Sequence, residues 1–372
     1  MKRLTPEERL FADRLRQRRW RRKLRRRERL ANSGERRSRR SAPIRILEGP
    51  AIFSFSRNYD ESVAFLREFK EAAFKTNYGR GERIALEFSS IDEISLAAAV
   101  VLSAEVDRWR YVKGLKLSPR NVKNWKPKVR AILEGIGLLR LLDIRSDISD
   151  ISLGDGLYTI FPISSGKSVS MDKVADRVDE LYAVNELFIQ KSAVYEVLCE
   201  AVNNTVLHAH KEPDARHPVT SYPRGSKRWW MATCYDASRD QVRLYIYDQG
   251  VGIPATLPFS ETFRTLPSLI RQHLTGPANR DGEAIKAAAT SRGTSTGLSQ
   301  HGRGLGEIIG IPNAARGGRV RIFSGRGSLT FTYGEAIYVT NESAHIGGTL
   351  IEWTIPCAQA EASDGQHHNP SN

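Results

Sequence analysis

The stretch YEVLCEAVNNTVLHA, Tyr195–Ala209, is the one around which the other motifs of the chain are arranged. Apolar residues and good helix formers recur there at spacings of three and four residues, which predicts a helix. Glu200 and Asn204 are four residues apart, so they project from the same face of that helix. A carboxylate one turn from a carboxamide on an apolar helix indicates a face that meets a charged ligand. A polar helix face exposed to solvent would show the same pair, and that alternative stays open for these two residues taken alone.

A Gly-rich stretch, YDQGVGIP, follows at Tyr247–Pro254. Asp248 ends a predicted strand beside a tight turn, where a carboxylate is a suitable acceptor for an exocyclic amine such as that of adenine. Gly250 and Gly252 would let the backbone approach the base closely. A DxGxG turn also occurs by chance at the ends of many strands.

A second Gly-rich stretch, HGRGLGE at His301–Glu307, directly precedes a predicted helix. Unpaired N–H groups and the positive end of the helix dipole make such a position an anion site. Arg303 would add charge-assisted contacts to phosphate. The alternative is a tight connection that binds no ligand. The sequence does not match the P-loop motif GxxxxGK(S/T). Gly347, Gly348 and Thr349 then open a terminal strand, where Thr349 either contacts the adenine end or is an ordinary strand threonine.

Taken in order, these motifs resemble the ATP-binding domain shared by gyrase, Hsp90, histidine kinases and MutL, the GHKL superfamily. The resemblance covers about residues 170–356 and implies a Bergerat-type α/β sandwich, a mixed sheet with helices on one face, with ATP and Mg²⁺ as cofactors. By that resemblance Glu200 is the catalytic glutamate, Asn204 the magnesium ligand and Asp248 the adenine-binding aspartate. The remaining nucleotide contacts implied are Gly250, Gly252, Gly302, Arg303, Gly304, Leu305, Gly306 and Thr349.

Residues 44–165 alternate between strand-like and helix-like patterns, which predicts a small sheet covered by helices. The expected elements are strands at 51–56, 83–90 and 115–119, and helices at 61–74, 95–112 and 129–142. LEFSSIDEISLAAAVVL and LEGIGLLRLL in this part resemble a STAS domain, the docking module of bacterial partner-switching systems. Ser95 is the nearest match to the phosphorylated residue of such switches, although a plain helix cap is the favoured interpretation.

In the second half, RWWMATCYDA and QVRLYIYD predict an antiparallel hairpin joined at residues 238–240, and four further strands are expected between 318 and 356. Residues 255–300 end in a Gly-, Ser- and Thr-rich run, which indicates either a cover over a ligand or a long loop. Pro312 is expected to end or restart the helix after Gly306. The overall expectation is an α+β or α/β chain with domains at 44–165 and 166–357, and a disordered tail at 358–372.

The net charge of +15 is concentrated at the start of the chain. Residues 1–40 hold 18 of the 57 Lys and Arg residues and 5 of the 42 Asp and Glu residues, so the remainder carries 39 against 37. Residues 1–43 therefore form a basic arm, expected to be disordered. Such an arm suits nonspecific contact with nucleic acid or an anionic surface, and a solubilising tail is the alternative.

The chain has no run of about 18 apolar residues and three cysteines without paired spacing. We therefore expect no membrane span, no disulfide framework and a cytoplasmic location. No histidine is followed by an acidic residue, which disfavours a self-contained histidine kinase. Three interpretations stay open: an ATPase or ATP-dependent switch that controls the docking of a protein partner, a serine/threonine kinase of the anti-sigma-factor type in bacterial signalling, and a non-catalytic ATP-binding or nucleic-acid-associated module. A homodimer also stays open.

Overall fold

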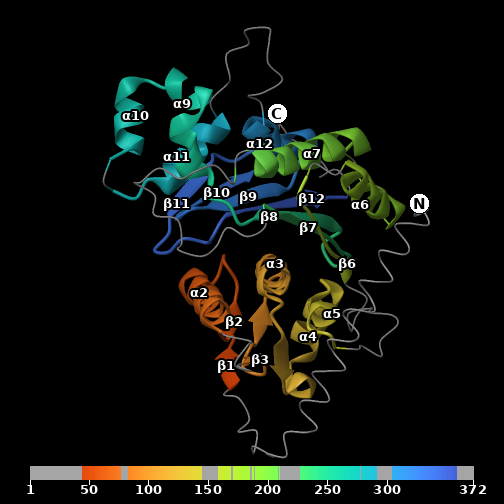
Figure 1. Ribbon diagram of the computed structural model, residues 1–372. Helices are drawn as coiled ribbons and strands as arrows, with labels where there is room; N and C mark the ends of the chain where they lie inside the picture. Colours follow the sequence, from red (N-terminus) through yellow and green to blue (C-terminus); the bar gives the residue numbers. More distant parts are fainter. Residues whose placement is uncertain are drawn as a thin grey trace, which may run out of the picture. The chain divides into compact units, whose positions relative to one another are not determined.

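The computed structural model describes residues 44–76, 83–144, 158–168, 171–184, 187, 189–207, 209, 227–276, 278–290 and 304–357. The chain from Ile44 onward belongs to one compact unit. The predicted basic arm and the predicted disordered tail lie outside the described residues. Figure 1 shows the order and arrangement of the elements.

The first part of the chain alternates strands and helices, as predicted. Strands β1 (Ile44–Glu48), β3 (Arg83–Glu87) and β5 (Leu117–Arg120) form a parallel sheet in the order β1-β3-β5. Two short strands, β2 (Ile52–Phe53) and β4 (Glu93–Ile94), form a separate parallel pair. The helical elements of this part are α2 (Tyr59–Lys75), α3 (Leu96–Lys113), η2 (Val122–Asn124), α4 (Pro127–Gly135) and α5 (Leu138–Leu141).

Three details of this part bear on the sequence predictions. The strand expected at 51–56 is only two residues long, because the chain turns at Ser54–Asn58, and the edge strand β1 was not predicted. The helix expected at 129–142 is broken at Gly137, whose φ of 89° lies outside the helical region. The predicted cap is confirmed, since the Ser95 hydroxyl accepts a hydrogen bond from the Ala98 N–H at 3.2 Å.

The second part is built on a seven-stranded sheet in the order β11-β10-β9-β12-β8-β7-β6. Its strands are β6 (Tyr158–Gly166), β7 (Trp229–Asp236), β8 (Gln241–Asp248), β9 (Arg319–Ser324), β10 (Gly327–Thr332), β11 (Tyr338–Asn341) and β12 (Thr349–Pro356). Every pair is antiparallel, so the prediction of a mixed sheet is wrong. The physical reason is that short turns such as those between β7 and β8 and between β9 and β10 can join only antiparallel neighbours.

Helices α6 (Met171–Val184), α7 (Lys191–Leu207), α11 (Asp281–Thr290) and α12 (Gly304–Ala314) accompany this sheet (Figure 1). Four short elements, α8 (Ile253–Thr256), η3 (Leu257–Phe259), α9 (Glu261–Thr265) and α10 (Ser268–Leu274), precede α11. Most of the segment expected to be a cover or long loop is therefore helical up to residue 290. Residues 291–303, with the Gly- and Ser-rich run, lie outside the described residues.

Pro312 does not end α12, which continues to Ala314. Proline removes the hydrogen bond that the Ile308 carbonyl would receive within the helix. That carbonyl instead accepts the indole N–H of Trp353 in β12 at 2.9 Å. A contact from the sheet thus satisfies the group that the proline leaves without its helical partner.

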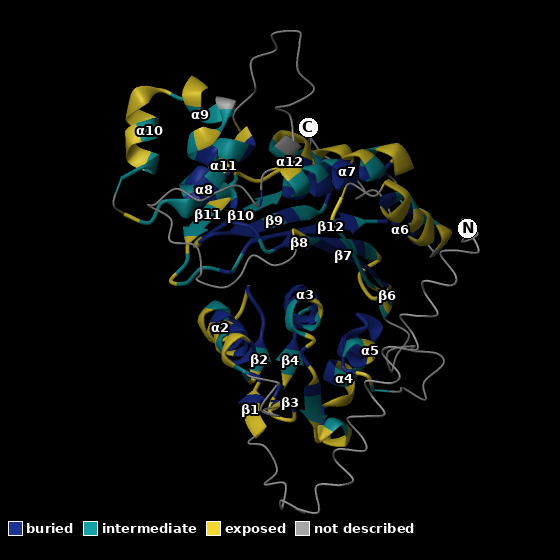
Figure 2. Cartoon of the chain, in the orientation of Figure 1, coloured by how far each residue is buried: buried dark blue, intermediate teal, exposed yellow. Residues whose placement is uncertain are grey.

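The central strands β7, β8 and β12 of the seven-stranded sheet are buried on both faces, whereas the edge strands β6 and β11 contain no buried residue (Figure 2). Along β8, Val242, Leu244 and Ile246 belong to a core shared with α6, α7, α11 and α12. The alternate residues Tyr245 and Tyr247 belong to a second core, shared with α2, α3 and the parallel sheet. The helices α6, α7, α11 and α12 of this part share the core on one face, as expected, whereas α3 of the first part packs on the other face, against β7, β8 and β12.

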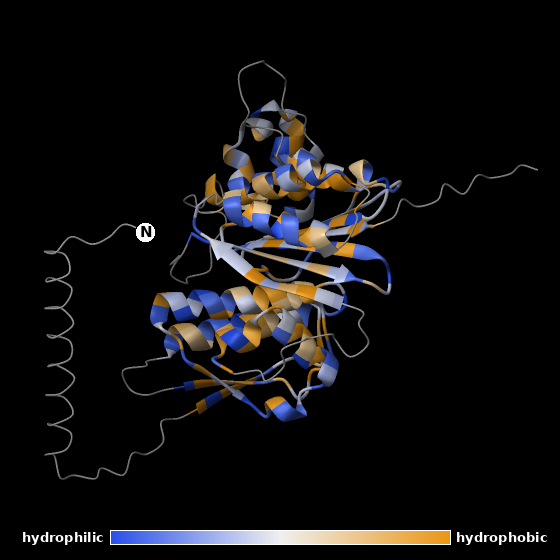
Figure 3. Ribbon diagram, turned by 90° about the vertical axis from the view of Figure 1, so that its right-hand side faces the viewer, coloured by the Kyte–Doolittle hydropathy of each residue, from blue (hydrophilic) through white to orange (hydrophobic). Residues whose placement is uncertain are grey.

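Figure 3 shows that the helices on both sides of the sheet carry both apolar and polar residues, as amphipathic helices do.

Strand β6 pairs with β7 and so belongs to the larger sheet, although it lies within the residue range expected for the first domain. Among the described residues no helix combines the length and the apolar character that crossing a membrane requires.

Candidate functional site

Helix α7 carries the predicted pair along the edge of its buried face. Its apolar side packs into the core through Val194, Leu198 and Val202. Glu200 and Asn204 are half-buried, one turn apart on this helix. The amide nitrogen Nδ2 of Asn204 is buried without a hydrogen-bond partner among the described residues. No partner of that nitrogen fixes the orientation of the amide, which leaves it able to turn its oxygen or its nitrogen toward a ligand.

Asp248 lies at the end of β8 and is only 5% exposed. Its Oδ1 accepts the backbone N–H of Gly250 at 2.8 Å. In the sheet Asp248 is directly opposite Thr349 of β12 and Trp229 of β7. The fold therefore brings two of the predicted site residues, Asp248 and Thr349, together from positions about 100 residues apart in the sequence.

Burial raises the pKa of Asp248 to about 7. The N–H groups of Gly250 and Thr349 and the hydroxyl of Thr205 favour the ionised form, but they offset only part of the effect of burial. Thr205 belongs to α7 and is itself buried. The Thr205 contact joins the helix of Glu200 and Asn204 to the carboxylate of Asp248.

The turn after Asp248 needs glycine at both predicted positions. A Cβ at Gly250 would collide with the backbone carbonyl of Ala209, just after α7, and that same carbonyl accepts the Val251 N–H at 2.7 Å. Gly252 has a φ of 90°, a conformation that side chains other than glycine rarely adopt. The glycines allow close packing of the turn against the chain that follows α7.

The Gly-Gly-Thr stretch closes the other side of Asp248. A Cβ at Gly348 would collide with the backbone carbonyl of Asp248. The Thr349 hydroxyl lies 2.8 Å from the hydroxyl of Ser324, and Ser324 Oγ also accepts the Ile253 N–H at 2.8 Å. Thr349 therefore helps to position the start of α8, which follows the turn.

Helix α12 begins at Gly304, so Gly304, Leu305 and Gly306 occupy its first turn rather than a loop before it. Gly302 and Arg303 lie outside the described residues. Leu305 is partly buried against the core of α7, and α12 lies against α7. The start of α12 and the Glu200 helix are thus neighbours.

Three further residues of this site were not predicted from the sequence, namely Thr205, Gln249 and Ser324. Thr205 follows Asn204 directly on α7 and is buried on the side of the helix that meets the sheet. Its place on that apolar side was the sequence signal that could have identified it. Gln249 carries two amide atoms, Nε2 and Oε1, that are buried without a hydrogen-bond partner among the described residues. A buried amide without partners costs free energy unless a ligand or water satisfies it, and only the folded structure shows that burial.

A buried charged cluster lies behind the site, on the face of the sheet that meets α2 and α3. Lys70 Nζ is 2.9 Å from Glu105 Oε1, and both side chains are almost completely buried. Burial and the charge of Glu105 raise the pKa of Tyr247, whose hydroxyl donates to the Gly347 carbonyl at 3.3 Å. A Cβ at Gly347 would meet the Lys70 ammonium group. The first part of the chain therefore contacts the Gly-Gly turn beside Asp248.

The described residues contain no group of three or more His, Cys, Asp or Glu side chains that could hold a metal ion by themselves. An Mg²⁺ ion at Asn204 would depend on phosphate oxygens and water for its other ligands, which is its usual coordination beside nucleotides. The carboxamide of Asn204 fits that role, because its oxygen can turn toward the ion.

Comparisons with protein-family models, with curated proteins and with solved structures find no match to this chain. The resemblance to GHKL ATPases and to STAS domains therefore rests on the motifs quoted above.

Proposed function

We propose that the chain binds ATP with Mg²⁺ between α7, the end of β8 and the start of β12. The observation that carries the proposal is Asp248, a buried carboxylate at a strand end whose neighbours Gly250 and Gly348 lie too close for any side chain. A carboxylate in such a position suits the exocyclic amine of adenine, which would otherwise lose a hydrogen bond on leaving water. The amide of Gln249, the next residue, is buried without a hydrogen-bond partner among the described residues and could supply a donor and an acceptor.

The phosphates would extend from Asp248 toward the start of α12. The N–H groups of the first turn of a helix lack partners within the helix, and they carry the positive end of its dipole. Helix α12 begins at Gly304 and lies against α7. Asn204 would then hold Mg²⁺, which neutralises phosphate charge when bound.

Glu200 would act as the general base, one helical turn from Asn204. A base must lie within hydrogen-bond reach of the proton that it accepts, and a fixed helix provides that position. Its role would be to take a proton from the water that attacks the terminal phosphate. The result would be hydrolysis, or a switch in which ATP changes the docking of a protein partner.

A serine/threonine kinase would use the same residues to send the phosphate to a protein hydroxyl. The contact of Lys70 and Tyr247 with the Gly-Gly turn favours coupling of the site to the first part of the chain. That contact is compatible with a switch and with a kinase. The fate of the phosphate distinguishes them.

The first test is ATP binding by isothermal titration calorimetry with Mg²⁺ present. Asp248→Asn keeps the shape of the side chain but presents an N–H group or a neutral oxygen to the amine. We expect the affinity for ATP to fall by about tenfold or more. Asp240→Asn, an exposed change in the turn of the same hairpin, is the matched control and should bind normally. Unchanged affinity in Asp248→Asn would show that the site is wrongly assigned.

The same titration and a turnover assay separate binding from chemistry. Glu200→Gln should bind ATP as well as the unchanged protein and release phosphate at least about 100-fold more slowly. Glu196→Gln, one turn earlier and exposed, should leave both properties unchanged. With γ-labelled ATP and a cell lysate, label on protein would favour the kinase, and free phosphate alone the ATPase. If ATP binds without either product, the non-catalytic interpretation holds.

A further inference from the structure

A cavity of about 670 Å³ lies at the start of β8, at the other end of the strand from Asp248. Arg243 lines it, and Arg243 is five residue steps along an extended strand from Asp248, roughly 17 Å. None of the predicted nucleotide-site residues lines the cavity. Its wall combines the start of α3, part of α4, and the ends of strands from the seven-stranded sheet. It is therefore separate from the proposed ATP site.

The cavity is strongly cationic. Five of its lining side chains are basic and one is acidic, namely Arg57, Lys128, Arg239, Arg243 and Arg319 against Glu93. The acid Asp236 lies buried just beneath two of the arginines. Counting Asp236 with Glu93, five positive charges face two negative charges. Three positive charges are left uncompensated.

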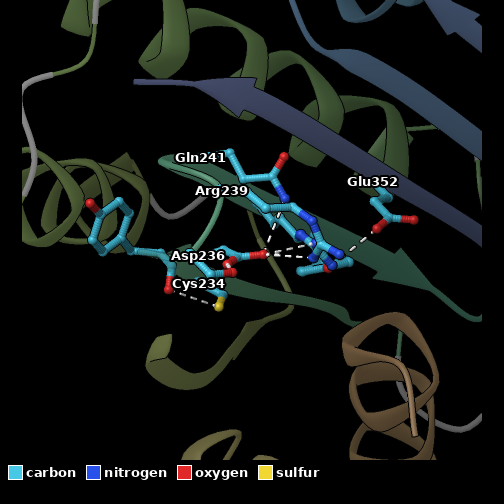
Figure 4. A network of polar contacts seen from close by, with 9 residues as sticks. Cys234, Asp236, Arg239, Gln241 and Glu352 are labelled. Atoms are coloured by element: carbon cyan, nitrogen blue, oxygen red, sulfur yellow. Dashed lines mark hydrogen bonds and ion pairs between the residues drawn. The ribbon is translucent and has the colours of Figure 1, made fainter. Parts of the chain in front are cut away.

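Asp236 holds two of these arginines in place (Figure 4). Its carboxylate accepts Arg239 Nη1 at 3.2 Å and Arg243 Nη2 at 3.1 Å, together with the amide of Gln241 at 3.2 Å. One carboxylate is shared between two guanidinium groups, so the pair keeps a net positive charge. Because Asp236 is completely buried, it fixes the arginines without itself occupying the cavity.

Lys128 and Arg319 contribute charge that no acidic side chain among the described residues neutralises by an ion pair. Arg319 begins β9, where Val320 and Ile322 face the core of α7. The alternation of a strand turns Arg319 to the opposite face, the same face as Arg243. The sequence patterns RVRIF and QVRLYIY therefore place cations of β9 and β8, the two strands that flank β12, on one side of the sheet.

Helix α3 adds a further positive contribution. This helix of 18 residues begins at the cavity, where Ser95 is its N-cap. Its first turn has no acidic residue. The positive end of its dipole is therefore not compensated within the helix. Hydroxyl groups of Ser54, Ser56, Thr332 and Thr354 line the same space and supply neutral donors.

We propose that this cavity binds a small phosphorylated molecule that carries at least two negative charges. The volume is that of a small-ligand site, and forked guanidinium groups match phosphate oxygens with two parallel hydrogen bonds. The cationic side chains of α4, β8 and β9, with Arg57 and Arg239 from turns, line one hollow together with the start of α3, which favours a small molecule over a macromolecule. The proposal is independent of ATP binding at Asp248.

The test uses inorganic pyrophosphate on the full chain at about 150 mM salt, where contacts of exposed charges are screened. Calorimetry compares the unchanged protein with Lys128→Gln/Arg319→Gln, and circular dichroism checks that both are folded. We expect the double variant to bind at least about tenfold more weakly. Lys123→Gln/Arg140→Gln removes two exposed charges outside the cavity and should bind normally.

A second measurement locates the bound anion. Lysine acetylation, mapped by mass spectrometry, should slow at Lys128 in the presence of pyrophosphate and remain unchanged at Lys123. Equal affinity of the unchanged and Lys128→Gln/Arg319→Gln proteins would overturn the proposal, as would no protection of Lys128 or no binding at millimolar concentration. Loss of pyrophosphate binding in Asp248→Asn alone would assign the anion to the ATP site and also overturn it. Failure of ATP binding would leave this cavity unaffected.

Discussion

Two buried aspartates of one hairpin show how partners decide the charge of a residue. Asp236 at the end of β7 and Asp248 at the end of β8 are both almost fully buried, and burial alone would raise the pKa of each. Asp236 nevertheless has a lowered pKa, because Ser238 and Gln241 donate to it and Arg243 and Arg239 add positive charge. Asp248 has only neutral donors, so burial prevails and its pKa rises to about 7. The first carboxylate is an anchor for arginines, whereas the second, below its pKa, would gain charge only if a further donor bound to it, as in the ATP complex proposed above.

The raised pKa of Asp248 predicts a pH dependence of stability. An unfolded aspartate ionises near pH 4, whereas folded Asp248 keeps its proton up to about pH 7. Between these values the unfolded chain binds fewer protons, so rising pH favours unfolding, and above pH 7 the penalty is constant. Asp248→Asn should therefore gain stability relative to the unchanged protein from pH 5 to pH 7, on the order of 1 kcal/mol per pH unit.

Urea unfolding at several pH values measures this difference. Asp240→Asn, whose residue is exposed, provides the matched comparison and should show no such trend. A constant difference between Asp248→Asn and the unchanged protein over this range would mean that the carboxyl is already ionised at pH 5.

At the scale of elements, the site depends on backbone packing that only glycine allows. The turn after β8 lies against the Ala209 carbonyl, which follows α7, and the start of β12 lies against the Asp248 carbonyl. Helix, turn and strand thus approach one another through main-chain atoms. Side-chain substitutions elsewhere on these elements can be accommodated by rotamer changes, whereas a backbone carbonyl cannot move without shifting its element.

Gly250→Ala tests this packing. Its methyl group would collide with the Ala209 carbonyl, so we expect a loss of stability of about 1–3 kcal/mol and weaker ATP binding. Gly310→Ala is the control: it lies inside α12 with open space around it and should raise stability by about 0.5–1 kcal/mol through helix propensity. Thermal unfolding and the ATP titration report the two effects. Equal behaviour of the two variants would contradict the proposed role of the turn.

At the scale of the whole molecule, the seven-stranded sheet lies between two hydrophobic cores and contributes side chains to both. Trp230, Tyr245, Tyr247, Phe323 and Leu350 face the first part of the chain rather than water. Tyr59 of α2 stacks on Phe323 of β9 and donates to the Ala344 carbonyl at 2.9 Å. Contacts of this kind reach the segment before β12, so the first part of the chain packs directly against the region that leads to Thr349.

Substitution of the buried Lys70–Glu105 ion pair tests how much the packing of the first part of the chain on the sheet contributes to stability. Lys70→Met leaves Glu105 buried with Arg108 at 3.8 Å as its remaining ion-pair partner, so we expect a loss of about 3 kcal/mol or more. Lys75→Met, on the same helix, removes only a surface pair with Glu71 at 3.5 Å and should cost less than about 1 kcal/mol. Chemical denaturation of both variants measures the difference. Equal costs would show that the buried pair adds no more stability than a surface pair.

Much of the fold could be predicted from local patterns. Helices α2, α3 and α7 follow from apolar spacing, the Ser95 cap from its position before an apolar run, and the β7–β8 hairpin from two alternating segments joined by a short polar turn. The break at Gly137 and the helices between residues 253 and 290 were missed, because local propensity does not reveal where tertiary contacts support short helices. The antiparallel β7–β8 hairpin was predicted correctly, but the mixed sheet that the resemblance implies was wrong, because every pair of the large sheet is antiparallel.

The order of the motifs and the concentration of charge at the start of the chain follow from the amino-acid sequence alone, since both are properties of neighbouring residues. Only the tertiary structure decided that Asp248 lies opposite Thr349, that Thr205 contacts its carboxylate, and that Lys70 reaches the Gly-Gly turn. It also decided that the cations of β8 and β9 meet those of α4 in one cavity. These juxtapositions depend on strand register and on burial from both sides of the sheet, which arise when distant segments pack together.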